Sequence, residues 1–579
     1  MLREAIYHKI DSDYCYALAK NKFLVKLRTK QDDVEKVNLI YMDKYKFNEV
    51  KKRYHKPMKK IARDGMFDYY EAIIDVDMLS FFYLFELIDK GEKIYYSNYK
   101  FFDEKPEGDN NTFVKPARAE KDIFIVPEWA RKAIVYQIFP ERFNNGDKSN
   151  DPRNIQDWYS KVDRESMLGG DLEGIINQLD YFQELGINTI YLTPIFQAGS
   201  NHKYNTFDYF KVDPQFGTIE TLKKLVSKAH EKRIRIILDA VFNHCGVDFH
   251  AFKDILKNGE KSEYKDWFDI KRFPVEVRED PDYATFGYVG LMPKLMTKNP
   301  QVKDYLISIA TYWIKEADID GWRLDVADEI DHSFWREFRN AVKAVKKDAL
   351  IIGEVWYDSS SWLQGDQFDS VMNYELQKAV SDFIIEDKFS SEEFECSMGF
   401  LRELYKLPAY NVLWNLIDSH DTPRFINKAK GDKSKLKLAV FMQFTLPGAP
   451  MIYYGDEVGM TGGQDPDCRR GMLWDEEKQD KELLQYYKKL IQIRKDNLSL
   501  TLGEFYTIYT NENIYGFRRD YEEEVLDIYI NRGNRAETLS LNVDGEGVLD
   551  ILSGDKYEAV DGKVNLTISE KSGIILKNI

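Results

Sequence analysis

The sequence predicts an α/β fold: a (β/α)8 TIM barrel with an inserted subdomain after its third strand, flanked by an N-terminal and a C-terminal β-sandwich. Three observations predict it. From about residue 128 to about 500, eight short apolar segments alternate with helical stretches. Before residue 105, apolar and polar residues alternate with the period of two that is typical of half-buried strands. The same alternation returns after about residue 500.

The bulk composition limits the kinds of partner. The chain of 579 residues has 82 basic and 98 acidic residues, a net charge of −16 that disfavours nucleic acid and anionic membranes and suits a neutral ligand. Aromatic residues reach 14%, which fits a rich core or platforms for sugar rings. The N-terminus carries no apolar leader, and no apolar run of about 18 residues occurs, so we expect a cytoplasmic protein. Four scattered cysteines form no CxxC pair, which argues against a disulfide framework or a zinc site: Cys15, Cys245, Cys396 and Cys468.

Residues 1–120 form the predicted N-terminal domain. The alternation is clearest over residues 22–28 and 69–77, and it indicates a small β-sandwich. A polar stretch at 106–111, followed by Lys115 and Pro116, predicts a linker to the barrel.

Residues 121–498 form the predicted barrel. Its eight strands are expected near 134–139, 189–192, 234–242, 321–325, 350–354, 368–372, 412–417 and 451–454. Helix-like segments lie between them, for example at 219–232 and 302–316. The connection after the third strand, residues 245–299, is long for a loop, so we expect an inserted subdomain with structure or a function of its own.

Residues 499–579 form the predicted C-terminal β-sandwich. Strand patterns occur at 514–519, 525–530 and 547–552.

Chemically active side chains follow four of the predicted barrel strands. They are His244 after the third strand, Arg323 and Asp325 in the fourth, Glu354 after the fifth, and His420 and Asp421 after the seventh. Taken singly, each is equally typical of a helix cap, a turn or an ion pair. Catalytic groups of such barrels sit at the C-terminal ends of the strands. Four strand ends that carry such groups therefore predict one catalytic site.

Two of these carboxyl groups suit the cleavage of a glycosidic bond. A retaining glycosidase uses two carboxyl groups about 5 Å apart, one as nucleophile and one as acid and then base. Asp325 and Glu354 lie on adjacent predicted strands. Arg323, on the same strand face as Asp325, would keep that carboxylate ionised, and partial desolvation beside Trp356 would favour a protonated Glu354.

These segments resemble the four characteristic regions of glycoside hydrolase family 13, the α-amylase family. The resemblance covers about residues 130–500 in the right order. It implies that Asp325 is the nucleophile, Glu354 the acid/base and Asp421 a stabiliser of the transition state. It also implies that five polar side chains bind the sugar beside the scissile bond: His202, Tyr204, His244, Arg323 and His420.

A shorter segment, Met292-Pro293-Lys294-Leu295, resembles a fifth region found in the neopullulanase, cyclomaltodextrinase and maltogenic amylase subgroup. That resemblance implies an N-terminal domain that builds a homodimer. It also implies acceptor-side contacts from Phe286, Tyr288 and Trp356, for which loop packing is the alternative explanation. The sequence departs from the subgroup at three positions that bear on substrate preference: Asn205, Met296 and Asp328.

A loop rich in oxygen donors, residues 145–151, precedes Gly169-Gly170-Asp171 by about twenty residues. Such donors suit Ca²⁺, and they equally suit an Asx-rich turn. The spacing resembles a calcium loop of the same subgroup. The resemblance implies a structural Ca²⁺ with these ligands: Asn145, Asp147, Asn150, Asp151, the carbonyl of Gly169, and Asp171.

The sequence thus predicts a retaining hydrolase of α-1,4 bonds in cyclomaltodextrins, maltooligosaccharides and pullulan, with some transglycosylation. The alternatives are an α-1,6-acting hydrolase or a 4-α-glucanotransferase and, from another class, a non-catalytic, transporter-associated barrel protein. Such non-catalytic relatives lose the carboxylates that are present here at Asp325, Glu354 and Asp421.

Overall fold

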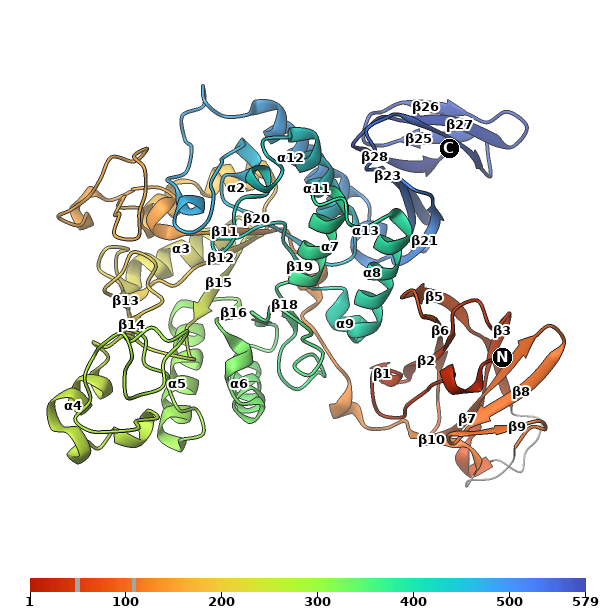
Figure 1. Ribbon diagram of the computed structural model, residues 1–579, viewed down its shortest axis with the longest axis horizontal. Helices are drawn as coiled ribbons and strands as arrows, with labels where there is room; N and C mark the ends of the chain where they lie inside the picture. The colour runs from red at the N-terminus through yellow and green to blue at the C-terminus, as the bar shows by residue number, and fades with distance from the viewer. Residues whose placement is uncertain (47–52, 107–110) are drawn as a thin grey trace.

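The computed structural model describes residues 1–46, 53–106 and 111–579. Figure 1 shows three parts: the N-terminal strands in red and orange, a central barrel, and the C-terminal strands in blue. No helix in these described ranges is both long enough and apolar enough to cross a membrane. The strand order of the sheets confirms the predicted fold, a barrel with two flanking β-domains.

The N-terminal domain consists of two sheets that enclose an apolar core. One sheet has the strand order β1-β2-β6-β5, and the other β4-β3-β7-β8-β9 with β10 added beside β7. Their bounds are β1 (Cys15–Ala19), β2 (Lys22–Lys30), β3 (Lys36–Asp43), β4 (Tyr54–Pro57), β5 (Lys59–Arg63), β6 (Phe67–Asp75), β7 (Ser80–Asp89), β8 (Glu92–Ser97), β9 (Lys100–Phe102) and β10 (Phe113–Pro116). Leu27, Tyr70 and Phe85 belong to the core between the sheets.

The linker prediction was wrong at Lys115 and Pro116. Both residues lie in β10, where they stand opposite Phe81 and Ser80 of β7. The strand is held because Phe113, at its start, is fully buried in the domain core. Residues 107–110 of the predicted linker lie outside the described residues.

Eight parallel strands close the barrel. Their order in the sheet is β18-β17-β16-β15-β12-β11-β20-β19, and a parallel bridge between Met372 and Trp414 joins the two ends. The strands are β11 (Val135–Ile138), β12 (Thr189–Leu192), β15 (Arg235–Ala240), β16 (Gly321–Leu324), β17 (Leu350–Gly353), β18 (Ser370–Val371), β19 (Trp414–Asn415) and β20 (Ala449–Tyr453). Successive residues of a strand face opposite ways: Ile237 packs inside the barrel, and Ile236 packs among the surrounding helices.

Helices cover the outside of the barrel. They are α1 (Leu172–Asn177), α2 (Leu179–Leu185), α3 (Ile219–Glu231), α5 (Pro300–Ala317), α6 (His332–Val345), α7 (Tyr374–Ile384), α8 (Ser391–Leu404), α9 (Leu407–Tyr410), α10 (Phe425–Lys428), α11 (Lys433–Thr445), α12 (Lys481–Asp496) and α13 (Ser499–Leu502). Local sequence sets their ends: α3 begins with a capping box between Thr218 and Thr221, and α5 begins with Asn299 as its cap and Pro300 in its first turn.

One connection departs from regular strand–helix alternation. The described residues 354–369, between β17 and β18, form turns without an α-helix. The segment contains three Ser and three Asp residues, which favour turns, and it lacks the apolar spacing of a buried helix face. The inserted subdomain after β15 is confirmed: it contains α4 (His250–Asn258) and short 3-10 turns, and bridges tie His244 to Lys294 and Phe268 to Leu295.

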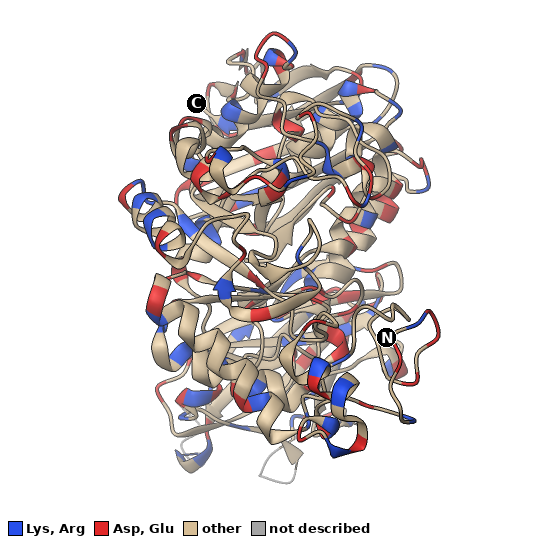
Figure 2. Ribbon diagram, turned by 90° about the vertical axis from the view of Figure 1, so that its left-hand side faces the viewer, with Lys and Arg blue, Asp and Glu red and all other residues tan. Residues whose placement is uncertain are grey.

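The C-terminal domain pairs a six-stranded sheet, β21-β22-β23-β28-β25-β26, with a two-stranded sheet, β24-β27. The bounds are β21 (Glu504–Thr510), β22 (Ile514–Tyr521), β23 (Glu524–Asn531), β24 (Glu537–Asn542), β25 (Gly547–Asp550), β26 (Lys556–Glu558), β27 (Lys563–Ile568) and β28 (Ser572–Asn578). Figure 2 shows acidic and basic residues interspersed over the ribbon, in keeping with a negative chain that carries many charges of both signs.

Candidate active site

The predicted catalytic side chains gather where the barrel strands end. Asp239 of β15 and Arg323 of β16 are partners in register, so both point to the same side of the sheet. Asp325 and Glu354 follow β16 and β17 directly. All four side chains are buried, and Arg323 is completely enclosed.

A single guanidinium contacts all three carboxylates. Nη1 of Arg323 lies 3.0 Å from Oδ2 of Asp239 and 2.9 Å from Oδ1 of Asp325, and Nη2 lies 2.8 Å from Oε2 of Glu354. Asp325 and Glu354 are therefore held on the two terminal nitrogens of one side chain. This geometry places two carboxyl groups beside each other at the mouth of the barrel.

The backbone next to Asp325 is strained. Val326 has φ 45° and ψ 48°, the left-handed region that a β-branched residue rarely occupies. In this conformation the Val326 amide donates a hydrogen bond of 3.0 Å to Oε2 of Glu354. The residue before Glu354, Gly353, packs so closely that a Cβ there would lie 2.5 Å from the ring of Phe368. The strand ends are thus shaped to hold Glu354.

Burial governs the electrostatics of this cluster. Three carboxyl groups surround one permanent cation, and burial raises the pKa of Asp239 to about 6, against the opposing effect of Arg323. Burial also raises the pKa of Asp325 well above its ordinary value, again opposed by Arg323 and reinforced by the charge of Glu354. The expectation that Arg323 alone keeps Asp325 ionised was therefore wrong for the free site, because burial outweighs the guanidinium. The excess of buried negative charge favours a cluster that retains a proton.

His420 links Tyr204 and Asp421 to this cluster. The Gln137 amide contacts Nδ1 of His420 at 2.7 Å, and Nε2 lies 2.6 Å from the Tyr204 hydroxyl and 3.2 Å from Oδ2 of Asp421. Tyr204 in turn donates to Asp239 at 3.2 Å. Burial lowers the pKa of His420 well below its ordinary value. The ring is therefore neutral and acts through hydrogen bonds.

The other two predicted histidines line the same region. Nδ1 of His202 accepts a hydrogen bond of 3.1 Å from the amide of Tyr204. The ring of His244 stacks on Phe286, with centroids 4.8 Å apart. Burial lowers the pKa of both histidines to about 3, so both are neutral. Neutral imidazoles can bind sugar hydroxyls without adding charge.

The predicted acceptor-side aromatics differ in their surroundings. Trp356 is 48% exposed, stacks on Tyr374 at a centroid distance of 3.9 Å, and donates to Oε1 of Glu354 at 3.1 Å. Phe286 is fixed against His244. Tyr288 is 92% exposed, so its side chain is almost entirely in contact with solvent. Trp356 is therefore the aromatic that is tied directly to a predicted catalytic group.

Several residues of the site were missed in the sequence. Arg469 donates to Oδ1 of Asp421 at 3.1 Å and to the carbonyl of His420 at 2.8 Å. Tyr191 donates to Asp239 at 2.5 Å. Arg469 lies in the long loop after β20, far from any predicted strand end, and the sequence around Tyr191 is typical of a buried strand. Asp239 was missed as well, although its position near the end of a predicted strand could have marked it as a site residue.

The predicted metal loop brings most of its oxygen donors together. Asp171 caps α1 by accepting from the amide of Gly174 at 2.6 Å, and it also accepts from Asn150 at 3.2 Å. Nδ2 of Asn145 donates to Asp151 at 2.6 Å. The side-chain oxygens of Asn145 and Asn150 are buried and have no hydrogen-bond partner in the described structure. Two orphaned amide oxygens suit a hard cation.

Gly169 and Asp147, the two remaining predicted ligands, lie at the same loop. A Cβ at Gly169 would lie 2.7 Å from atoms of both Asn145 and Asp151, so its backbone adjoins the loop. Asp147 turns its carboxylate to Ser149, whose amide lies 2.9 Å away. In the described residues, no three His, Cys, Asp or Glu side chains converge as a metal site. A cation here would therefore need the amide and carbonyl oxygens in addition to the carboxylates of Asp151 and Asp171 beside them.

A parallel eight-stranded barrel with paired carboxyl groups at its strand ends is the arrangement that a retaining glycoside hydrolase requires. Comparison with known proteins identifies the family. Residues 137–503 match the model of the alpha amylase catalytic domain, and residues 1–118 match the alpha amylase N-terminal ig-like domain. The chain belongs to the α-amylase family, glycoside hydrolase family 13.

Relatives of similar length match almost the whole chain. The chain is 49% identical over 554 residues to a cyclomaltodextrinase of Thermoanaerobacter pseudethanolicus (strain ATCC 33223 / 39E), covering 95% of this chain and 96% of the relative. It is 43% identical to neopullulanase 2 of Thermoactinomyces vulgaris, covering 100% of each. A solved structure described as a cyclomaltodextrinase superposes with a TM-score of 0.95 at 43% identity and covers 100% of both chains.

Proposed function

We propose that this glycoside hydrolase cleaves α-1,4-glucosidic bonds of cyclomaltodextrins, maltooligosaccharides and pullulan with retention of anomeric configuration, and that it transfers some glucosyl groups to sugar acceptors. The observation that carries the proposal is the placement of Asp325 and Glu354 on the two terminal nitrogens of Arg323. The names of the relatives, cyclomaltodextrinase and neopullulanase, support this substrate class.

In the first step, the Asp325 carboxylate attacks the anomeric carbon while Glu354 gives its proton to the glycosidic oxygen. The bond between that carbon and oxygen breaks, the leaving sugar departs as an alcohol, and a glucosyl ester of Asp325 remains. In the second step, Glu354 takes a proton from water, the water oxygen attacks the same carbon, and the Asp325 carboxylate leaves. Two inversions give net retention.

The neighbours of these groups have supporting roles in the proposal. Arg323 compensates the negative charge of Asp325 when the ester is not formed. Asp421, held by Arg469, would bind sugar hydroxyls and oppose the positive charge that develops on the sugar ring. Tyr204 would stack beneath the ring, and His202, His244 and His420 would bind its hydroxyls. When a sugar hydroxyl replaces water in the second step, the outcome is transglycosylation.

The test is product analysis on β-cyclodextrin, pullulan, starch and isomaltose. We expect ring opening of β-cyclodextrin to be fastest, and NMR of the first products to show the α-anomer. Faster cleavage of isomaltose than of maltotriose would instead identify an α-1,6-acting hydrolase. Disproportionation of maltooligosaccharides without net gain of reducing ends would identify a 4-α-glucanotransferase.

We also propose that the loop at 145–151 holds a structural Ca²⁺. The buried, unpartnered oxygens of Asn145 and Asn150 support it, together with the carboxylates of Asp151 and Asp171 beside them. The remaining ligands would be Asp147 and the carbonyl of Gly169. Bound there, the ion would tie the loop to the start of α1. The proposed reaction needs no metal.

We further propose a homodimer built through the N-terminal domain and a cytoplasmic location. A dimer would cover exposed apolar side chains of that domain: Tyr45 is 67% exposed, Leu79 65% and Tyr99 56%. The four free cysteines, three of them buried, support a reducing compartment. Light scattering after size exclusion tests the dimer, and a mass of 68.1 kDa in dilute solution would contradict it.

A further inference from the structure

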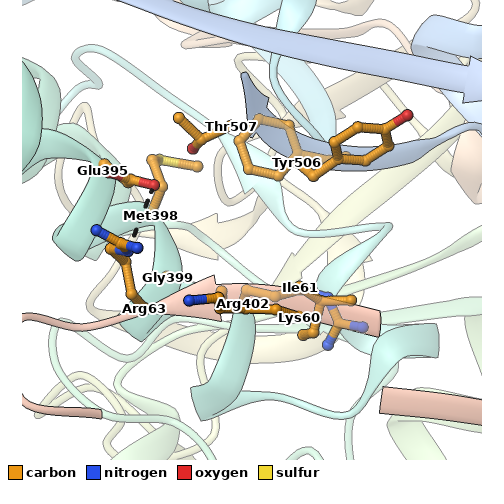
Figure 3. Close-up of a pocket in the computed structure, with 11 residues that line it drawn as sticks. Lys60, Ile61, Arg63, Glu395, Met398, Gly399, Arg402, Tyr506 and Thr507 are labelled. Carbon is orange, nitrogen blue, oxygen red and sulfur yellow. Dashed lines mark ion pairs between the residues drawn. The ribbon is translucent and has the colours of Figure 1, made fainter. Parts of the chain in front are cut away.

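A cavity of about 190 Å³ lies where all three parts of the chain meet. Its walls come from β5 of the N-terminal domain, α8 of the barrel and β21 of the C-terminal domain. Figure 3 shows Tyr506 and Thr507 on one side, Ile61 and Lys60 opposite them, and Arg63 and Glu395 at one end. None of these residues belongs to the active site, so the cavity is a separate feature.

Arg402 lines this cavity and has an unused donor. The residue is only 7% exposed, and its Nη2 donates to Glu71 at 2.6 Å. Its Nη1 is buried and has no hydrogen-bond partner in the described structure. A buried, charged N–H group without an acceptor is costly, so an oxygen atom beside it, from water or from a bound molecule, would be stabilising.

The charge around the cavity does not favour an anion. Three cations line it, and four carboxylates lie within 4.0 Å of them: Asp32, Asp68, Glu71 and Glu395. The carboxylates therefore outnumber the lining cations Lys60, Arg63 and Arg402. An anionic ligand would gain no net attraction, whereas a neutral ligand with several hydroxyl groups could pair with donors and acceptors alike.

The size and the walls suggest what such a ligand is. The volume corresponds to roughly six water molecules and is smaller than typical pockets for drug-sized ligands, so it suits a single small ring. The aromatic side chains of Phe505 and Tyr506 offer faces on which C–H groups can pack. The Glu395 carboxylate, 4.0 Å from Nε of Arg63, keeps acceptor sites, and the Thr507 hydroxyl, which already pairs with the Tyr515 hydroxyl at 3.1 Å, keeps a free lone pair.

We propose that this junction cavity binds a small neutral polyol of the size of one sugar ring, with D-glucose as the probe. The Arg402 Nη1 group donates to a ligand hydroxyl oxygen, Glu395 accepts from another hydroxyl, and Tyr506 covers a C–H face. Because the walls come from three domains, occupancy stabilises their arrangement by mass action. The proposal goes beyond the catalytic function and does not depend on which glucan is cleaved.

The test uses the full-length D325N variant, labelled with ¹³C at its methionine methyl groups. Excess β-cyclodextrin first fills the active site, and its binding is verified separately by calorimetry. D-glucose is then titrated while the Met398 methyl signal, assigned with M398L, is followed. Met398 lines the cavity and is 3% exposed. We expect its signal to shift saturably, while that of Met442, buried in α11, stays constant.

Variants separate the cavity from other glucose sites. Y506A should weaken glucose binding about tenfold, and the matched control Y509A, on the same strand outside the cavity, should not. If Y506A fails to fold, T507V, which keeps the shape, should weaken binding about three- to tenfold. The proposal is overturned if glucose leaves Met398 unmoved, if neither variant weakens binding, or if inorganic phosphate shifts Met398 and glucose does not.

Discussion

Lys26 of the N-terminal sheet and Glu403 of barrel helix α8 form an ion pair with Nζ and Oε2 3.0 Å apart. The two side chains are 1% and 8% exposed, so the pair is shielded from water. A second pair, Arg402 with Glu71, joins the same helix to the same sheet at 2.6 Å. Buried charges therefore help to dock the N-terminal domain on the barrel.

Removing one member of the first pair should destabilise the protein. E403Q leaves a buried ammonium without its counter-ion, and we expect a loss of about 3–5 kcal/mol, seen as a lower melting temperature. The double variant K26M/E403L should recover most of this loss. K59A is the matched control, because Lys59 and Glu504 form an exposed pair at 3.2 Å, and its effect should stay within about 1 kcal/mol. Equal effects of E403Q and K59A would contradict the argument.

Substitution of the two catalytic carboxyl groups should impair the reaction in different ways. D325N removes the nucleophile and should lower kcat about 10⁴-fold or more on every substrate. E354Q removes the acid, so cleavage of maltooligosaccharides should fall similarly. An α-glucosyl fluoride needs no protonation of its leaving group, so E354Q should still react with it and accumulate the covalent ester, visible by mass spectrometry. An ester formed by D325N, or none formed by E354Q, would reverse the assigned roles.

The fold could be read from the sequence wherever each element has its own local pattern. The segment at 189–192 coincides with β12, and the helix-like segment at 219–232 contains α3. The pair of Lys26 with Glu403 could not be predicted, because 377 residues separate its members and neither has a distinctive local pattern. The missing helix after β17 and the role of Arg469 depend likewise on the folded loops.

Trp356 should control the competition between water and sugar acceptors. W356A removes an exposed ring that stacks on Tyr374 and holds Oε1 of Glu354. We expect the ratio of transfer to hydrolysis to fall about tenfold, since a sugar acceptor loses its stacking surface and water does not. W356F keeps a ring and should lie between the two. Product chromatography with maltotriose and excess glucose measures the ratio, and an unchanged ratio in W356A would refute this role.

His8 should make the N-terminal domain sensitive to acid. Its ring is buried between the Lys26 carbonyl and the Tyr83 hydroxyl, both 2.8 Å away, with the charge of Lys115 nearby. Burial lowers its pKa from 6.5 to about 3. Between these two pKa values the unfolded chain binds a proton that the folded chain does not. The contribution of His8 to the free energy of unfolding is therefore fully present above pH 6.5 and decreases as the pH drops towards 3.

The H8Q variant isolates this effect, because glutamine does not titrate and the other buried histidines contribute equally to both proteins. Relative to H8Q, the wild type should lose up to ~1.4 kcal/mol per pH unit between pH 6.5 and 3. Denaturation followed by circular dichroism at several pH values measures the difference. Parallel pH profiles of the two proteins would show that His8 is not responsible.

Calcium should stabilise the protein without taking part in catalysis. If the loop at 145–151 binds Ca²⁺ in the folded state only, an ion concentration 100 times the Kd adds about 2.7 kcal/mol of stability. We expect chelation to lower the melting temperature and added Ca²⁺ to restore it. N150A removes one of the orphaned oxygens and should abolish the response. The variant D157A, which changes an exposed Asx-turn residue of the same loop region, should respond as the wild type does.

A melting temperature that changes neither with chelator nor with Ca²⁺ would contradict the calcium site. The unpartnered amide oxygens of Asn145 and Asn150 would then be satisfied by water, and the loop would be an ordinary Asx-rich turn.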